Sequence, residues 1–337
     1  MGSVVQLKKK INNSYSDLLK SVEDKLILVD EKISFKLNSK VDLIQKMTNY
    51  HLDTGGKKLR ALLTLSSSKL CGYSKGGRDI NLAACVELIH AATLMHDDVI
   101  DNALVRRNKK TINTIWGNKS SILVGDYLLS RCFEMMVEDG SLEILKLLST
   151  TSSEIAQGEV LQLQHHGEID MLEETYLKII SLKTAALFSA STKVGAILAN
   201  KDSKYKEALE FYGKNLGLTF QIADDALDYN SELKLFGKKI GNDFYEGKVT
   251  LPIIILHQKC SVEEKKFLKI MFNKENRQED ELKLILEKIK KYNVINECYK
   301  KAEYFINLAS NSLSIFEDNQ EKEVLKNLTS FSIERNF

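Results

Sequence analysis

Apolar positions recur at helical spacing along nearly the whole chain, and the alternating runs typical of strands are few. Pro252 is the single proline among 337 residues. Because proline interrupts helices, its scarcity favours long continuous ones. We therefore predict an all-α protein. The predicted helices cover roughly residues 13–50, 59–72, 79–103, 120–138, 141–164, 171–199, 203–230, 249–259, 262–273, 278–292 and 294–331.

Two of these segments are apolar nearly all round, Leu82–Met95 and Leu216–Ala226, which predicts central, buried helices. Residues 262–274 and 279–292 instead separate charged from apolar faces, so we expect them on the outside. The glycine-containing breaks are short, and no Pro/Gly/Ser linker divides the chain. We predict a single domain over residues 1–337.

Composition narrows the function classes. With 43% hydrophobic and 28% charged residues the chain has the make-up of a folded, soluble protein, and no run of about 18 apolar residues predicts a membrane span. The 48 basic and 46 acidic residues are too balanced for a nucleic-acid-binding surface. Five cysteines without CxxC spacing indicate reduced thiols in a cytoplasmic protein. Peripheral membrane contact stays open.

The two buried segments end in the same acidic pattern, LMHDDVID and QIADDALD. On a helix, Asp97 and Asp101 lie on one face about one turn apart with Asp98 beside them, and Asp224, Asp225 and Asp228 repeat this geometry. A solvated face or a helix cap is the ordinary interpretation of so short a pattern. Apolar neighbours such as Val99 and Ile222, however, place the carboxylates where unpaired charge is costly. Compensating cations are therefore expected.

Carboxylate oxygens, with His96 as the one adjacent imidazole, suit hard divalent ions, and Mg²⁺ is the natural candidate. Because Mg²⁺ takes one or two carboxylates together with phosphate oxygens, two facing acidic helices predict a phosphate-bearing substrate.

Basic residues near glycine-containing breaks and the acidic patterns fit such a substrate, although each alone is typical of a solvated surface charge. Neither GxxxxGK[ST] nor a strand-borne GxGxxG is present, which disfavours a nucleotide site. His165-His166 is expected to be a surface pair. His90, on the buried helix, is either a satisfied core histidine or a contact to a second substrate.

An ordered set of motifs resembles the trans-isoprenyl (polyprenyl) diphosphate synthases over about residues 40–260: GGKKLR, ELIHAATLMHDDVID, RR, VGDYLLS, AQGEVLQL, KTAALF, FQIADDALDY and GKKIGNDFYEGKVTLP. The tail FSIERNF is similar to the ends of longer-chain members, so we expect resemblance to octaprenyl and decaprenyl diphosphate synthases. The resemblance implies an isoprenoid synthase fold, a single-domain bundle of antiparallel helices around a central catalytic cavity, usually in a homodimer.

The resemblance also implies roles by position. The metal ligands, for three Mg²⁺ ions, would be Asp97, Asp98, Asp101, Asp224, Asp225 and Asp228. The allylic diphosphate would contact Arg106, Lys183, Thr184, Gln221, Lys238 and Lys248. Isopentenyl diphosphate would contact Lys57, Arg60, His90 and Arg107. The chain departs from the common family pattern at Lys58, Ala61 and Asn108, where we expect modest effects on affinity.

The implied reaction is head-to-tail condensation of isopentenyl diphosphate with an allylic diphosphate. Asp97, Asp101, Asp224, Lys183 and Arg106 form the expected catalytic set, because metal ions and cations stabilise charge on the departing diphosphate. Three alternatives remain: a terpene cyclase, a non-catalytic subunit of a heteromeric synthase, and a plain helical scaffold. The predicted isopentenyl diphosphate contacts argue against the first, and two complete aspartate motifs against the second.

Product length depends on what lies below the first aspartates. Ala92, five residues before Asp97, is about 7.5 Å deeper along the helix. In the family an aromatic residue near this depth stops growth at short products, whereas Ala92 and Thr93 leave the path open. We predict an all-trans product of roughly C40–C50, as used for quinone side chains such as that of ubiquinone. A short-chain farnesyl or geranylgeranyl diphosphate synthase is the alternative, since small residues also permit tight helix packing.

Overall fold

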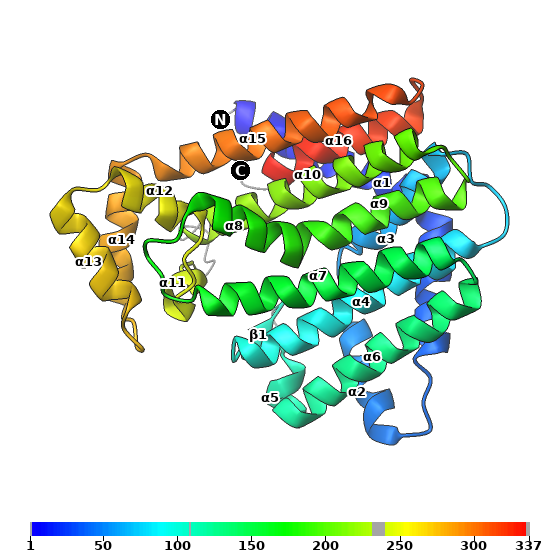
Figure 1. Cartoon of the computed structure of the whole chain (residues 1–337), viewed down its shortest axis with the longest axis horizontal. Helices are drawn as coiled ribbons and strands as arrows, with labels where there is room; N and C mark the ends of the chain where they lie inside the picture. Colours follow the sequence, from blue (N-terminus) through cyan, green and yellow to red (C-terminus); the bar gives the residue numbers. More distant parts are fainter. Residues whose placement is uncertain (1, 108, 231–239, 335–337) are drawn as a thin grey trace.

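The computed structural model describes residues 2–107, 109–230 and 240–334, with side chains described between residues 16 and 329 of these ranges. Within them the fold is almost entirely helical, and the only strands are the antiparallel pair β1 (Val105–Arg106) and β2 (Lys109–Lys110). Long helices run side by side across the molecule (Figure 1). The all-α prediction is confirmed.

The helices follow the predicted order. They are α1 (Gly2–Lys36), α2 (Asp42–Asp53), α3 (Leu59–Leu70), α4 (Arg78–Ile100), α5 (Ile112–Trp116), α6 (Asn118–Asp139), α7 (Leu142–Gln164), α8 (Glu173–Ile180), the π-helix η1 (Ser181–Ala185), α9 (Ala186–Leu198), α10 (Ser203–Asp228), α11 (Asn242–Glu246), α12 (Leu251–Lys259), α13 (Val262–Phe272), α14 (Glu279–Lys291), α15 (Val294–Ser312), the 3-10 turn η3 (Leu313–Ile315) and α16 (Gln320–Glu334).

Two predicted helices are divided in the structure. The segment 13–50 is broken after Lys36, because polar residues there bond to the local backbone: Ser39 Oγ accepts from Val41 N at 3.1 Å. The segment 294–331 is broken after η3, where Asn319 Oδ1 accepts from Lys322 N at 2.8 Å and starts α16. Helical periodicity continues across both breaks, which is why the sequence pattern did not show them.

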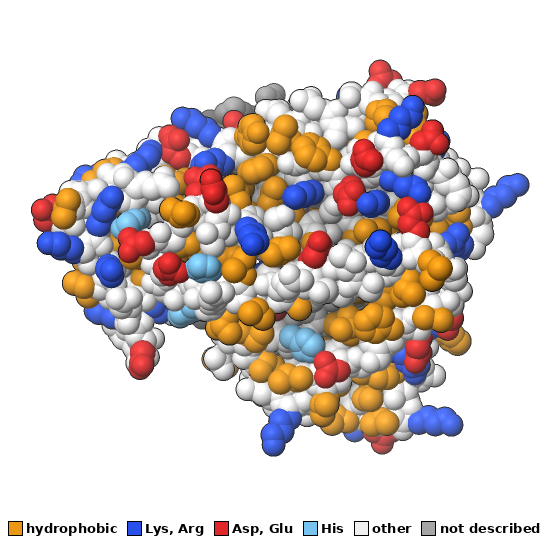
Figure 2. All heavy atoms as spheres, in the orientation of Figure 1, with side chains coloured by type: hydrophobic (Ala, Val, Ile, Leu, Met, Phe, Trp, Pro, Cys, Tyr) orange, Lys and Arg blue, Asp and Glu red, His pale blue; other side chains and the backbone are white. Residues whose placement is uncertain are grey.

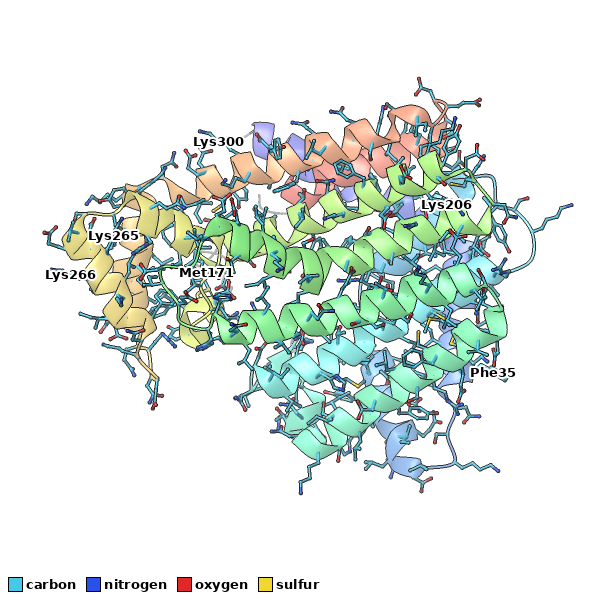
Figure 3. All side chains as sticks on the ribbon, viewed as in Figure 1. Phe35, Met171, Lys206, Lys265, Lys266 and Lys300 are labelled. Carbon is cyan, nitrogen blue, oxygen red and sulfur yellow. The ribbon has the colours of Figure 1, made fainter. Side chains whose placement is uncertain are left out.

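The interior and exterior helices are as predicted. Leu82 in α4 and Leu216 in α10 are fully buried, and α10 packs against α9 and α15. Residues of α10 belong to both hydrophobic clusters of the core, as a single domain would require; the single-domain boundary stays a prediction. At the periphery α13 projects Lys265 and Lys266 (Figure 3).

Two glycines let three elements meet at η1. A Cβ on Gly158 of α7 would lie 2.6 Å from the backbone nitrogen of Lys183, and one on Gly217 of α10 would lie 2.6 Å from Cα of Ala185. The π-helix is therefore held between α7 and α10 at close approach. Such π turns are often found at functional sites, and this one carries Lys183 and Thr184.

The acidic ends of the two central helices come together. In Figure 1 the C-terminal ends of α4 and α10 lie toward the same end of the molecule, where β1 and α11 are also found. Among the described residues, no helix combines the length and apolar character needed to span a membrane.

Candidate active site

Residues from both aspartate motifs and from the basic segments line one cavity of about 770 Å³. From the sequence-predicted set it collects Lys57, Arg60, His90, Thr93, Asp97, Asp101, Arg106, Arg107, Lys183, Thr184, Gln221 and Asp224. A smaller neighbouring cavity of about 100 Å³ is lined by Asp225 and Lys248 and shares Lys183, Thr184 and Gln221 with the first. Lys238 lies outside the described residues.

Arg106 neutralises one aspartate of the first motif. The β1–β2 hairpin turns the chain back after α4, so that Arg106 Nε lies 2.8 Å and Nη2 2.7 Å from Asp98 Oδ1. Asp98 is buried, and this ion pair provides its charge partner.

Asp97 and Asp101 face lysines from distant segments. Lys183 Nζ lies 4.0 Å from Asp97 Oδ2, pairs with Glu159 and donates to Gln162 Oε1 at 2.9 Å. Lys248 Nζ lies 2.9 Å from Asp101 Oδ1. Burial raises the pKa of Asp97 to about 7, even though Lys183 opposes the shift. The carboxylate is therefore costly to ionise without further cations.

Asp225, in the second motif, is the end of a polar network. It accepts from the Tyr176 hydroxyl at 2.7 Å and from Gln221 Nε2 at 2.7 Å, and Gln221 Oε1 accepts in turn from Thr184 Oγ1 at 2.8 Å. Burial raises the pKa of Asp225 to about 7 despite these donors. The network links α8, η1 and α10 and fixes the carboxylate.

Asp228 is held by the start of α11. Its carboxylate accepts from the backbone N–H groups of Asn242 at 3.0 Å and Asp243 at 2.9 Å. Asp243 itself is an acidic residue that sequence reasoning missed: it lines the smaller cavity beside Asp225, and burial raises its pKa well above the usual range. Its place in the short glycine-bounded stretch GNDFYEG, among the predicted lysine contacts, is the signal that could have found it.

The basic residues assemble at the other side of the cavity. Gly56 lies against the Arg107 guanidinium, which donates to the Gly55 carbonyl. The Arg60 guanidinium lies 4.7 Å from the centre of the Phe188 ring, and burial lowers its pKa to about 10. Burial also lowers the pKa of His90 well below its usual value, so the imidazole is neutral at pH 7. Two carboxylates lining this cavity, Glu87 and Glu159, were also missed.

The inner end of the cavity is aliphatic. Thr93 lines it with its hydroxyl bonded to the His90 carbonyl at 2.8 Å, which satisfies the polar group. Ala92 is buried in the adjoining core at 2% exposure and does not itself line the cavity. The remaining inner lining includes Ile33, Leu37, Leu88, Leu128 and Ile155.

The donor set fits a divalent ion shared with a substrate better than an ion bound by protein alone. Among the described residues no group of three or more acidic, histidine or cysteine side chains is close enough to hold an ion. Carboxylates of both aspartate motifs instead line one cavity, and hard divalent ions such as Mg²⁺ are commonly bound by one or two carboxylates, water and substrate phosphates. The arrangement can thus bind a metal together with a diphosphate.

Comparison with known proteins settles the family. The model of the polyprenyl synthetase family matches residues 41–289. The chain belongs to this family. As a polyprenyl synthetase it is 35% identical to the all-trans-nonaprenyl-diphosphate synthase (geranyl-diphosphate specific) of Rhodobacter capsulatus, over 95% of this chain and 97% of the relative. It is 36% identical to the octaprenyl diphosphate synthase of Escherichia coli, over 91% and 94%.

The fold agrees with solved polyprenyl synthases. A crystal structure from Caulobacter crescentus, in complex with calcium and isoprenyl diphosphate, superposes with a TM-score of 0.91 at 37% identity, over 96% of this chain and 98% of that one. Short-chain isoprenyl diphosphate synthases are also among the relatives of this polyprenyl synthetase. The expected family, its prenyltransferase activity and the resemblance to long-chain members are confirmed.

Proposed function

We propose that the protein condenses isopentenyl diphosphate with an allylic diphosphate, head to tail, to build a long all-trans polyprenyl diphosphate. The observation that carries this is the two-sided cavity. Carboxylates of α4 and α10 (Asp97, Asp101 and Asp224) and a basic group at α3 and β1 (Lys57, Arg60 and Arg107) line one space. Two anionic substrates can therefore bind beside each other, with their reacting carbons between them.

The acidic side receives the allylic diphosphate. Asp97, Asp98, Asp101, Asp224, Asp225 and Asp228 would hold Mg²⁺, three ions in all, which when bound stabilises negative charge on the diphosphate. The calcium and isoprenyl diphosphate in the Caulobacter relative support a divalent metal here. Arg106, Lys183 and Lys248 already lie beside these carboxylates and add cations for the leaving group, while Thr184 and Gln221 orient Asp225.

The basic side receives isopentenyl diphosphate through Lys57, Arg60, His90 and Arg107. Aliphatic residues close the space below, and their exclusion of water lets the allylic carbocation react with the alkene. No side chain of the cavity stands out as the base, so we assign proton removal to the departing diphosphate.

The inner lining supports a long product. Besides the polar groups around Glu87 and His90, the lining below Thr93 includes aliphatic side chains, and these continue as far as Ile33 of α1 and Leu37 directly after it. A growing chain can extend along these side chains, giving roughly C40–C50, a length suited to quinone side chains. We place the enzyme in the cytoplasm, in keeping with its five free, buried cysteines, and expect brief peripheral membrane contact when the apolar product leaves.

A homodimer is supported by an exposed apolar surface on α6 and α7. Figure 2 shows hydrophobic side chains along these helices. The exposed members are Ile122, Leu123, Phe133, Val137, Leu142, Val160 and Leu163. Apolar area of this kind marks subunit contacts. Leu123→Glu, at one of the most exposed members of this surface, should shift the protein to monomers in analytical ultracentrifugation, whereas Tyr304→Glu, similarly exposed on α15, should not.

Product analysis tests the function. Purified protein with Mg²⁺, farnesyl diphosphate and excess isopentenyl diphosphate should give a ladder of products ending near C40–C50 by mass spectrometry, and EDTA should abolish it. A stop at C15–C20 would establish the short-chain alternative. Absence of elongation with farnesyl and shorter primers would contradict the proposal and favour a cyclase or a partner-dependent subunit.

A further inference from the structure

Glu87 of α4 is a partly buried carboxylate among the basic residues of the cavity. It precedes His90 by about one helical turn and lines the same space. Its Oε1 accepts from the backbone N–H of Ala61 at 2.9 Å, directly after Arg60 in the chain. The carboxylate of α4 is thereby fixed against the first turn of α3, where Arg60 is located.

The contacts of Arg60 leave part of its guanidinium group without a hydrogen-bond partner. Its guanidinium stacks on Phe188 of α9, and its buried Nε has no hydrogen-bond partner among the described residues. Glu87 is the acidic group that favours its charged form, against the effect of burial. An arginine without a counter-charge in such surroundings would be costly.

Glu87 stands among cations. Burial raises its pKa, and the Ala61 N–H, Arg60, Lys58 and Arg107 oppose that rise by favouring the ionised form. These three cations line the cavity together with Lys57. Like charges in this group repel one another until an anion binds. A carboxylate placed beneath them reduces this repulsion and fixes the cation nearest to it, so that no reorientation is needed on binding.

We propose that Glu87 is a positioning residue for isopentenyl diphosphate: its negative charge, fixed against α3 by the bond to Ala61, holds Arg60 in the orientation that binds the diphosphate. This inference rests on the proposed function, since it takes isopentenyl diphosphate as the ligand of Arg60. Glu87 acts through Arg60 and does not touch the reacting atoms. Its removal should therefore affect isopentenyl diphosphate affinity and leave the allylic site and the chemical step largely intact.

Glu87→Gln is the sharpest test, because the amide keeps an acceptor for Ala61 N–H and removes only the charge. We expect the Kd of isopentenyl diphosphate by calorimetry, and its KM, to rise about tenfold, with kcat and the allylic KM changed by less than about twofold. In an Arg60→Gln background the same substitution should add no further loss. Unchanged affinity in Glu87→Gln, or losses that add in the double variant, would overturn the inference.

Asp79→Asn is the matched control. Asp79 is a buried carboxylate of α4 that pairs with Lys25. It lies about 12 Å from Glu87 along the helix, in the direction away from Asp97, and it does not line the cavity. Its loss should lower Tm and leave isopentenyl diphosphate affinity unchanged; an equal loss of affinity there would show a general effect of destabilising α4 and overturn the inference.

Two further outcomes are decisive. If Glu87→Gln does not fold, Glu87→Asp, which keeps the charge but shortens the side chain, should show the same selective loss at smaller size, and wild-type affinity would overturn the inference. Wild-type protein that binds isopentenyl diphosphate but forms no product would contradict the proposed function alone. Wild-type protein that binds none would overturn both.

Discussion

Single carboxylates at this site are positioned at the expense of stability. Asp97 is largely removed from solvent and lies near Glu159 and Asp101; burial first and these carboxylates second raise its pKa, and only Lys183 and Arg106 oppose the rise. Asp225 has more hydrogen-bond donors than Asp97, because it accepts from the Tyr176 hydroxyl and from Gln221 Nε2. Such charges in an apolar setting destabilise the metal-free fold, and bound metal and diphosphate would relieve them.

Asp97→Asn should stabilise the metal-free protein while abolishing turnover. Since burial raises the folded pKa from 3.8 to about 7, the wild-type protein loses stability as pH rises between these two values, where only the unfolded carboxyl is ionised. The variant should therefore gain on the order of 2 kcal/mol at pH 8, and the gain should shrink as pH falls from about 7 to about 4 and vanish near pH 3, where the wild-type carboxyl is protonated in both states. Denaturant unfolding in EDTA measures this; equal stability at pH 8, or retained turnover, would contradict it.

Tyr176→Phe should weaken the second motif without disturbing packing. It removes one of the two side-chain donors to Asp225 found among the described residues, a buried hydrogen bond to a charged group worth about 1.5–3 kcal/mol. We expect kcat/KM for the allylic diphosphate to fall about tenfold and the Mg²⁺ concentration for half-maximal rate to rise. Tyr229→Phe is the control, because the buried Tyr229 hydroxyl has no partner among the described residues. Equal losses in both variants would remove the role assigned to this bond.

At the scale of elements, sequence patterns predicted what is local and missed what depends on packing. The apolar character of α4 and α10 and the aspartates near their ends could be predicted, because each of these features lies within a single short stretch of the sequence. The π-helix was not, since it depends on glycines contributed by α7 and α10. Asp243 was missed for a similar reason: its role follows from the return of α11 to the end of α10, where its N–H meets Asp228.

Gly158→Ala should perturb this packing at the site. The added Cβ would approach the backbone nitrogen of Lys183 to 2.6 Å, which a side-chain rotation cannot relieve. We expect a loss of about 1–3 kcal/mol in stability and, because Lys183 moves with its backbone, a larger than tenfold fall in kcat. Gly195→Ala meets the backbone of Ser68 as closely but lies between α9 and α3; when folded it should keep kcat near wild type. A similar fall in kcat in Gly195→Ala would show that any loss of helix packing lowers kcat, and would contradict a specific effect through Lys183.

At the scale of the whole molecule, the cavity joins charge at one end to aliphatic walls at the other. The charged end was predictable residue by residue from ordered motifs. The depth of the cavity was not predictable, because its lining combines residues of α1, α4, α6 and α7, which are distant in sequence. The structure also separates the two predicted chain-length positions: Thr93 faces the cavity, and Ala92 is packed in the core beside it.

This separation predicts how the product distribution changes. Thr93→Phe places a ring in the cavity one turn below Asp97, so it should stop elongation at C15–C20 with initial condensation preserved. Ala92→Phe should also shorten products, but at a cost in stability, since its ring must displace core neighbours to reach the same space. Thr93→Val, of equal size, should keep the wild-type ladder in mass spectrometry. If both phenylalanine variants still made wild-type products, the growing chain would have to follow a different path, and the aliphatic lining from Leu88 to Ile33 would not be its route.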